Sequence, residues 1–160
     1  MQPSGHLWAS GARGLAVLFD ANLLVHAHAA DSPLHGVARR LRDQAARGEL
    51  EACISPQVLC EFFAVCTNER FVRPALTSKQ AAAEMATYWQ ASGFRKILPK
   101  DTTVRRLTEL VAQHTIGKQQ VFDAFLVATM LDNGVRTIYT QNTKDFVRYS
   151  ELQAINPFTT

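Results

Sequence analysis

Four acidic side chains lie either just after predicted strands or within mostly apolar helical stretches, where they could take part in chemistry. Asp20 directly follows the apolar run at residues 15–19, and Asp145 comes shortly after the apolar run at 135–140. Glu61 and Asp123 lie within helical stretches whose other residues are mostly apolar. Burying an ionised carboxylate costs several kcal/mol unless it is paired or coordinated. Glu61, in an almost wholly apolar helical stretch, therefore needs a partner most clearly.

Each acid taken alone also has an ordinary structural explanation. Asp20 suits a turn or the cap of a helix, and an acid near a helix start, as at Asp123, is favoured by the helix dipole. Glu61 could form a salt bridge with an arginine on another helix. Two strand ends that both carry polar side chains favour a site, because ligands of parallel α/β sheets bind outside the carboxyl ends of the strands. If the two strands are neighbours, Asp20, Asn142 and Asp145 point into one crevice.

Four carboxylates gathered in one place would repel one another, and some would hold protons. A hard divalent cation removes that conflict, and all-oxygen ligands suit Mg²⁺ or Mn²⁺. Such an ion can activate a bound water and neutralise charge on a phosphodiester in the transition state. The chain has no GxxxxGK[ST] loop, the motif that grips the phosphates of a nucleoside triphosphate. The acids therefore favour metal-assisted hydrolysis of a nucleic acid backbone.

The elements that would position these acids alternate along the chain. Short apolar runs predict strands, and helical periodicity predicts helices. The predicted strands are residues 15–19, 50–54, 95–98, 135–140 and 152–155. The predicted helices are residues 33–47, 56–70, 78–93, 101–115 and 119–133. Strands separated by helices pair in parallel through right-handed crossovers, so we expect an α/β fold, a three-layer α/β/α domain around a central, mostly parallel sheet of four or five strands.

Local signals mark several of these helix ends. Ser55 as N-cap and Pro56 at the first helical position begin one helix. Thr77 or Ser78 caps the next helix, and Gly134 ends the last one.

Composition restricts the class of protein. The 160 residues are 47% hydrophobic and carry a net charge of only +3, which excludes an intrinsically disordered chain and argues against a protein that coats DNA through bulk charge. No stretch approaches the ~20 apolar residues of a membrane helix. We expect residues 1–14 to form a flexible leader, residues 15–157 to form one domain, and the protein to lie in the cytoplasm.

Three further residue sets have simple structural interpretations. The cysteines are odd in number and lack CxxC spacing, which indicates buried side chains in a reducing compartment rather than a disulfide or zinc site: Cys53, Cys60 and Cys66. Four aromatic side chains flank two of the acids, and core packing is expected for them over base stacking: Phe62, Phe63, Phe122 and Phe125. Four arginines share one helix and form either a solvated face or a grip on phosphates: Arg39, Arg40, Arg42 and Arg47.

Four segments of the sequence together resemble a PIN domain. They read Leu-Phe-Asp20-Ala-Asn22, Ser55-Pro-Gln-Val-Leu-Cys-Glu61-Phe, Phe-Asp123-Ala-Phe-Leu-Val-Ala-Thr and Thr140-Gln-Asn142-Thr-Lys-Asp145-Phe146. More narrowly, the chain resembles the toxin ribonucleases of bacterial VapBC-type toxin–antitoxin modules, over about residues 15–157. Each motif is weak alone, but four in this order, with their acids 41, 62 and 22 residues apart, are specific.

The resemblance implies a Mg²⁺- or Mn²⁺-dependent endoribonuclease that acts as the toxin of a type II module. Asp20, Glu61 and Asp123 would be its central acids, as metal ligands and as catalytic residues. In relatives the fourth acid stands either where Asn142 stands or where Asp145 stands. We expect Asp145 to be the fourth catalytic and metal-binding acid, with Asn142 in a supporting role.

Two more polar residues, Asn22 and Thr140, are expected to orient the site through hydrogen bonds, with a plain turn or strand-end role as the alternative. The resemblance also implies partners. These are an RNA substrate, a small antitoxin protein whose C-terminal segment enters the active-site groove, and a second copy of the chain in a homodimer.

Two other functions compete with the nuclease. A phosphatase of the haloacid-dehalogenase type also has an Asp after its first strand, but Asn22 replaces its second Asp, and no later Lys followed by paired acids is evident. A catalytically inactive PIN module that binds RNA or a partner protein would lack a central acid, and none is missing. The sequence therefore favours the nuclease.

Overall fold

Five parallel strands form the sheet of the computed structural model, which describes residues 16–159. They are β1 (Val17–Phe19), β2 (Ala52–Ile54), β3 (Phe94–Lys96), β4 (Thr137–Tyr139) and β5 (Gln153–Ile155). The strand order is β3-β2-β1-β4-β5, and every neighbouring pair is parallel. The predicted α/β fold with a parallel sheet is confirmed, although each strand is shorter than its apolar run.

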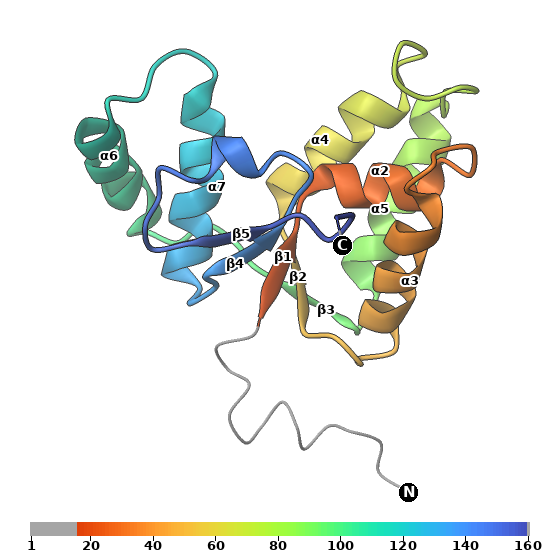
Figure 1. The fold of residues 1–160 in the computed structure, drawn as a ribbon, viewed down its shortest axis with the longest axis horizontal. Helices are drawn as coiled ribbons and strands as arrows, with labels where there is room; N and C mark the ends of the chain where they lie inside the picture. Colours follow the sequence, from red (N-terminus) through yellow and green to blue (C-terminus); the bar gives the residue numbers. More distant parts are fainter. Residues whose placement is uncertain (1–15, 160) are drawn as a thin grey trace, which may run out of the picture.

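Helices cover both faces of this sheet, as Figure 1 shows. They are α2 (Ala21–His28), α3 (His35–Ala46), α4 (Pro56–Cys66), α5 (Ser78–Gln90), α6 (Thr103–His114) and α7 (Gln120–Asp132). In Figure 1, α6 and α7 lie on one side of the sheet and α2, α3 and α5 lie on the other, while α4 packs against α2 and α5. The structure thus has the three predicted layers.

The direction of winding reverses at β1. From β1 the chain moves to β2 and then to β3, whereas the connection through α6 and α7 returns past β1 to β4. Right-handed crossovers in opposite directions place their helices on opposite faces. In open parallel sheets the crevice at such a reversal, outside the carboxyl ends of the strands, is where ligands bind. The adjacency of β1 and β4 therefore brings Asp20 close to the residues that follow β4.

The helix ends predicted from the sequence are formed by the expected residues in the structure. Ser55 Oγ accepts a hydrogen bond from the Val58 amide at 3.2 Å, with Pro56 as the first helical residue. Thr77 caps α5, and Gln80 completes a reciprocal capping box with it. Gly134 has φ of +71° just after α7, a left-handed conformation that glycine adopts without steric cost.

One helix was not predicted. α2 begins immediately after β1, and Asp20 is its N-cap. Five of its eight residues are buried, so the segment shows no single apolar face of the kind that helical periodicity detects. α4 also ends at Cys66, four residues before its predicted end.

Burial corrects one expectation about the cysteines. Cys53 and Cys66 are buried as predicted, but Cys60 is exposed, because Val58, Leu59 and Phe62 form the core-facing side of α4. The predicted leader at residues 1–14 lies outside the described residues, and the single domain over residues 15–157 stays a prediction. Between residues 16 and 159, no helix is both long enough and apolar enough to cross a membrane.

Candidate active site

One cavity of about 500 Å³ at the carboxyl ends of the strands is lined by all four predicted acids. Asp20 comes from the end of β1, Glu61 from α4, Asp123 from α7 and Asp145 from the 3₁₀ turn Thr143–Asp145 after β4. The predicted supporting residues Asn22 and Asn142 line it as well. We call this space the acid cavity. Four segments that are far apart in sequence therefore meet at the reversal point of the sheet.

Asp20 is the most tightly held of the acids. Its Oδ1 accepts a hydrogen bond from the Ala21 amide at 2.8 Å, as expected of a helix N-cap. Its Oδ2 accepts from the Thr140 hydroxyl at 2.7 Å and from Asn22 Nδ2 at 3.3 Å. Only 7% of Asp20 is exposed, and this burial is the main cause that raises its pKa, against the effect of these hydrogen bonds.

Asn22 and Thr140 join α2 to the loop after β4. Thr140 Oγ1 accepts hydrogen bonds from Asn22 Nδ2 at 3.2 Å and from the Asn142 amide at 3.0 Å. Asn22 Oδ1 accepts from the Gln141 amide at 3.1 Å. The structure therefore gives both residues positions from which they orient Asp20 and the loop that carries Asn142.

Glu61 lines the acid cavity from α4. Gln57, one helical turn earlier, donates from Nε2 to Glu61 Oε1 at 3.3 Å and to the Phe122 carbonyl at 2.8 Å. Burial, together with the nearby Asp20 and Asp123, raises the pKa of Glu61 to about 7. No lysine or arginine in the described part of the chain forms an ion pair with Glu61, so the salt-bridge alternative is wrong.

Asp123 lies in the first turn of α7. Burial and the charges of Asp145 and Asp20 raise its pKa to about 6, while Arg148 acts in the opposite direction. Asp145 thus acts electrostatically on both Asp123 and Asp20. Asn142 lines the same cavity but carries no charge, so Asp145 is the fourth acid of the cluster in electrostatic terms.

The donor set suits a hard divalent cation held partly through water. All four acids offer carboxylate oxygens, and the pKa values of three of them are raised partly by mutual repulsion, which a cation would relieve. Within residues 16–159, no three His, Cys, Asp or Glu side chains are placed to hold one metal ion among them. Mg²⁺ usually keeps several waters and binds proteins through one or two carboxylates, so the cavity fits a hydrated ion.

The sequence interpretation missed three side chains near the acids. Gln57 could have been found from its i, i+4 relation to Glu61. His26 lines the acid cavity and contacts Gln141 Oε1 through Nε2 at 2.9 Å. Arg148 affects Asp123 electrostatically. No spacing signal marks His26 or Arg148, because tertiary folding alone brings them to the site.

The expected core packing of the flanking aromatic residues is wrong for Phe122. Phe62 is fully buried, whereas 57% of Phe122 is exposed. Phe122 lies in the first turn of α7, which extends past the sheet in Figure 1. Because this turn projects beyond the sheet, the Phe122 side chain is left largely exposed to solvent.

Comparisons with known proteins agree with this architecture. The family model described as PIN domain matches residues 17–152. A relative named Ribonuclease VapC24, from Mycobacterium tuberculosis, is 25% identical over 140 residues, which cover 88% of this chain and 95% of the relative.

Solved structures with the same fold include two toxin-related proteins. VapC20 of Mycobacterium tuberculosis, described as a sarcin-ricin loop cleaving toxin, superposes with a TM-score of 0.62 at 18% identity, covering 83% of this chain and 95% of that one. A toxin–antitoxin complex from Klebsiella pneumoniae gives a TM-score of 0.56 at 20% identity, covering 88% and 97%. At these identities the likeness establishes the fold.

Proposed function

The chain belongs to the PIN-domain family, and from that premise we propose that it is a metal-dependent endoribonuclease, the toxin of a type II toxin–antitoxin module. The observation that carries this proposal is the meeting of Asp20, Glu61, Asp123 and Asp145 in one cavity. The relative named Ribonuclease VapC24 aligns over nearly its whole length, which supports the same activity for this chain.

The four carboxylates have distinct environments, and these suggest distinct roles in cleaving an RNA phosphodiester. A bound Mg²⁺ or Mn²⁺ would supply charge neutralisation at the phosphate and would lower the pKa of a bound water. Asp20, fixed by Thr140 and Ala21, gives the ion an oriented ligand. Asp123 and Asp145 flank the same space and complete the negative pocket.

Glu61 is the acid best suited to move a proton. Its Oε1 is held by Gln57, and its Oε2 has no hydrogen-bond partner among the described side chains and amides. In the metal-free protein the Glu61 carboxyl has a pKa of about 7, near the working range of a general base at neutral pH. Glu61 Oε2 would accept the proton of the attacking water.

The proposal extends to partners and location. A small antitoxin is the expected inhibitor, since one solved structure with this fold is described as a toxin–antitoxin complex and another as VapBC2 bound to a DNA fragment from its promoter. A homodimer and an RNA target in the cytoplasm follow from the same family membership. These elements rest on relatives, whereas the catalytic assignment rests on the acid cavity itself.

The test is cleavage of total cellular RNA by purified, antitoxin-free protein in Mg²⁺ or Mn²⁺, with and without EDTA. We expect discrete, EDTA-sensitive fragments, and we expect Asp123→Asn to produce none. Asp101→Asn is the matched control, because Asp101 is an exposed acid outside the acid cavity. If folded wild-type protein cuts no RNA in either metal but binds it, the inactive RNA-binding module is the correct function.

A further inference from the structure

A small polar recess opens beside the acid cavity and shares two of its acids. It holds about 20 Å³ and is lined by Gln120, Asp123, Asp145, Arg148 and Tyr149. A volume of this size admits about one water molecule or one oxygen of a larger group. We call it the side recess. Because Asp123 and Asp145 line both spaces, a phosphate bound near these acids would lie close to Arg148.

Among residues 16–159, no side chain pairs with the guanidinium of Arg148. Arg42, Arg47 and Arg106 each pair with a carboxylate. Arg148 has no ion pair or hydrogen bond from its side chain within residues 16–159, yet its charge lowers the pKa of Asp123. It is therefore near the acids without being neutralised by direct contact, and it remains available to another anion.

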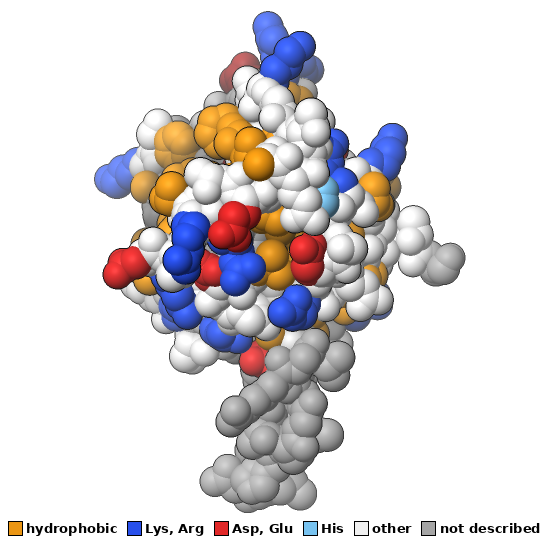
Figure 2. Space-filling model, turned by 90° about the vertical axis from the view of Figure 1, so that its left-hand side faces the viewer, with side chains coloured by type: hydrophobic (Ala, Val, Ile, Leu, Met, Phe, Trp, Pro, Cys, Tyr) orange, Lys and Arg blue, Asp and Glu red, His pale blue; other side chains and the backbone are white. Residues whose placement is uncertain are grey.

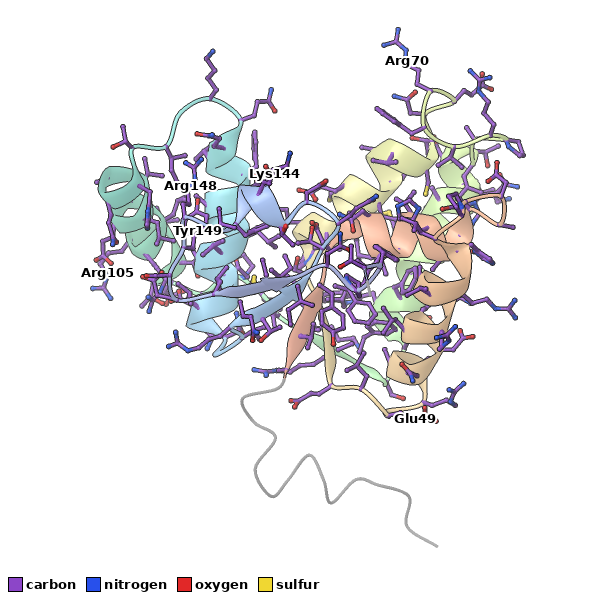
Figure 3. The ribbon with its side chains drawn as sticks, viewed as in Figure 1. Glu49, Arg70, Arg105, Lys144, Arg148 and Tyr149 are labelled. Carbon is purple, nitrogen blue, oxygen red and sulfur yellow. The ribbon has the colours of Figure 1, made fainter. Side chains whose placement is uncertain are left out.

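Two buried aromatic anchors hold the backbone on either side of Arg148. Phe146 is 2% exposed and Tyr149 is 1% exposed. The Tyr149 amide donates to the Phe146 carbonyl at 3.1 Å, and the Tyr149 ring packs edge-on against His114 of α6 with centroids 5.0 Å apart. Figure 3 shows Arg148 and Tyr149 next to α7, with Lys144 nearer to α4. Arg148 is thus placed by the fold rather than by a mobile loop.

The surface around α6 and α7 does not offer a broad positive field. Figure 2, which faces this side, shows Lys and Arg side chains interspersed with Asp and Glu. A nucleic acid held there needs specific cationic contacts, because charges of both signs are interspersed and physiological salt screens exposed charges beyond about 8 Å. The acid cluster itself repels phosphate, so a cation at its edge has a clear use.

We propose that Arg148 binds a backbone phosphate of the RNA, next to the phosphodiester that the acids cleave. This inference rests on the proposed function and identifies a further substrate-contacting residue for it. Arginine suits the role because its planar guanidinium can donate two parallel hydrogen bonds to one phosphate. The side recess then accommodates one phosphate oxygen, and the acid cavity accommodates the reacting group.

The experiment separates RNA binding from RNA cleavage. Binding of a labelled, mixed-sequence single-stranded RNA is measured in an Asp20→Asn background, and cleavage of total cellular RNA is measured in the otherwise wild-type protein. Each assay compares Arg148→Ala, Arg148→Lys and the control Arg105→Ala. Arg105 is an exposed arginine on α6 that lines neither space, and Figure 3 shows it on the far side of α6 from the cavity.

We expect Arg148→Ala to weaken binding about tenfold and to slow cleavage by at least as much, with Arg148→Lys in between. The salt dependence of binding should also fall, by about 0.7 in the log–log slope for one lost phosphate contact on a single strand. Thermal melting checks that the variants are folded. If Arg148→Ala matches Arg105→Ala in both assays, the inference is overturned while the nuclease stands. If no variant cleaves RNA but Arg148→Ala still weakens binding, the contact stands and the nuclease fails.

Discussion

The Thr140 hydroxyl donates a 2.7 Å hydrogen bond to Asp20 Oδ2 across 120 residues of sequence. Thr140 is fully buried, and Asp20 is nearly so. Burial raises the pKa of Asp20, and the Thr140 hydrogen bond is the largest effect that lowers it. Thr140 therefore orients a buried carboxylate and favours its ionised form, and this contact exists only because β1 and β4 are neighbours.

Replacing Thr140 with Val should damage the site while preserving the shape of the strand end. Thr140→Val removes the hydroxyl that bonds Asp20 and leaves Oδ2 of the carboxylate with only its longer contact to Asn22. A buried charged group that loses a hydrogen bond costs about 1–3 kcal/mol. We expect lower stability in urea unfolding and at least a tenfold loss of RNA cleavage. Thr140→Ser should recover most of both, and equal activity of the Val and Ser variants would refute the role.

The metal-free protein should lose stability as the pH rises toward neutrality. Burial and nearby acids raise the pKa of Glu61 from 4.5 to about 7, so the folded state binds its proton more tightly than the unfolded state. This contribution is complete below pH 4.5 and is lost by about pH 7. Asp123, raised from 3.8 to about 6, acts in the same direction.

Glu61→Gln tests this pH dependence directly. The variant removes the titrating group and keeps an oxygen that can accept the hydrogen bond from Gln57. We expect it to gain about 1–2 kcal/mol of stability over wild type near pH 8 in EDTA, after allowance for solvent screening of a partly exposed group, and to gain nothing near pH 4. Urea unfolding at both pH values measures the difference. A gain independent of pH would contradict the pKa assignment.

Divalent cations should reverse the cost of gathering the acids. A ligand that binds only the folded state adds about 2.7 kcal/mol at 100 times its dissociation constant. We therefore expect Mg²⁺ or Mn²⁺ to raise the melting temperature of wild-type protein near neutral pH, and EDTA to remove the gain. Asp20→Asn should respond much less, while Asp101→Asn should respond like wild type. An equal rise for Asp20→Asn would place the ion elsewhere.

The fold was predictable because its signals are local and agree with one another. Ser55 and Thr77 mark helix starts, and short apolar runs mark strands, so their alternation indicates a parallel sheet. α2 was missed because it is short and buried around most of its surface. The strand order was not predictable, because it depends on which crossovers reverse direction and not on any one segment.

The site was predictable only in part, because it too depends on the strand order. Asp20 and Asp145 are visible as acids near strand ends, and Glu61 and Asp123 are visible as acids in apolar helices. Their convergence required β1 and β4 to be neighbours, which the structure supplies. Arg148 carries no sequence signal, since its position depends on the burial of the aromatic residues around it.

Gln57 is expected to couple the two helices that carry Glu61 and Asp123. Its Nε2 bridges Glu61 Oε1 and the Phe122 carbonyl, so it joins α4 to the first turn of α7. If the Gln57 amide were flipped, its oxygen would face two other acceptors, the Glu61 carboxylate and the Phe122 carbonyl. The observed orientation, with the nitrogen toward them, is therefore the one that forms both hydrogen bonds. The Oε1 atom of Gln57 itself is buried without a hydrogen-bond partner in the described structure. A buried polar atom of this kind lowers the stability of the fold.

Substitution at Gln57 should therefore affect cleavage more than folding. Gln57→Ala frees Glu61 and opens the contact between α4 and α7, and we expect a several-fold loss of the cleavage rate with a stability change of about 1 kcal/mol or less. Gln57→Glu should be worse, because it replaces a donor with a negative charge beside Glu61. Gln90→Ala, at an exposed helix end, is the control. Single-turnover rates at saturating protein isolate the chemical step, and a Gln57→Glu variant as active as wild type would exclude the bridge from catalysis.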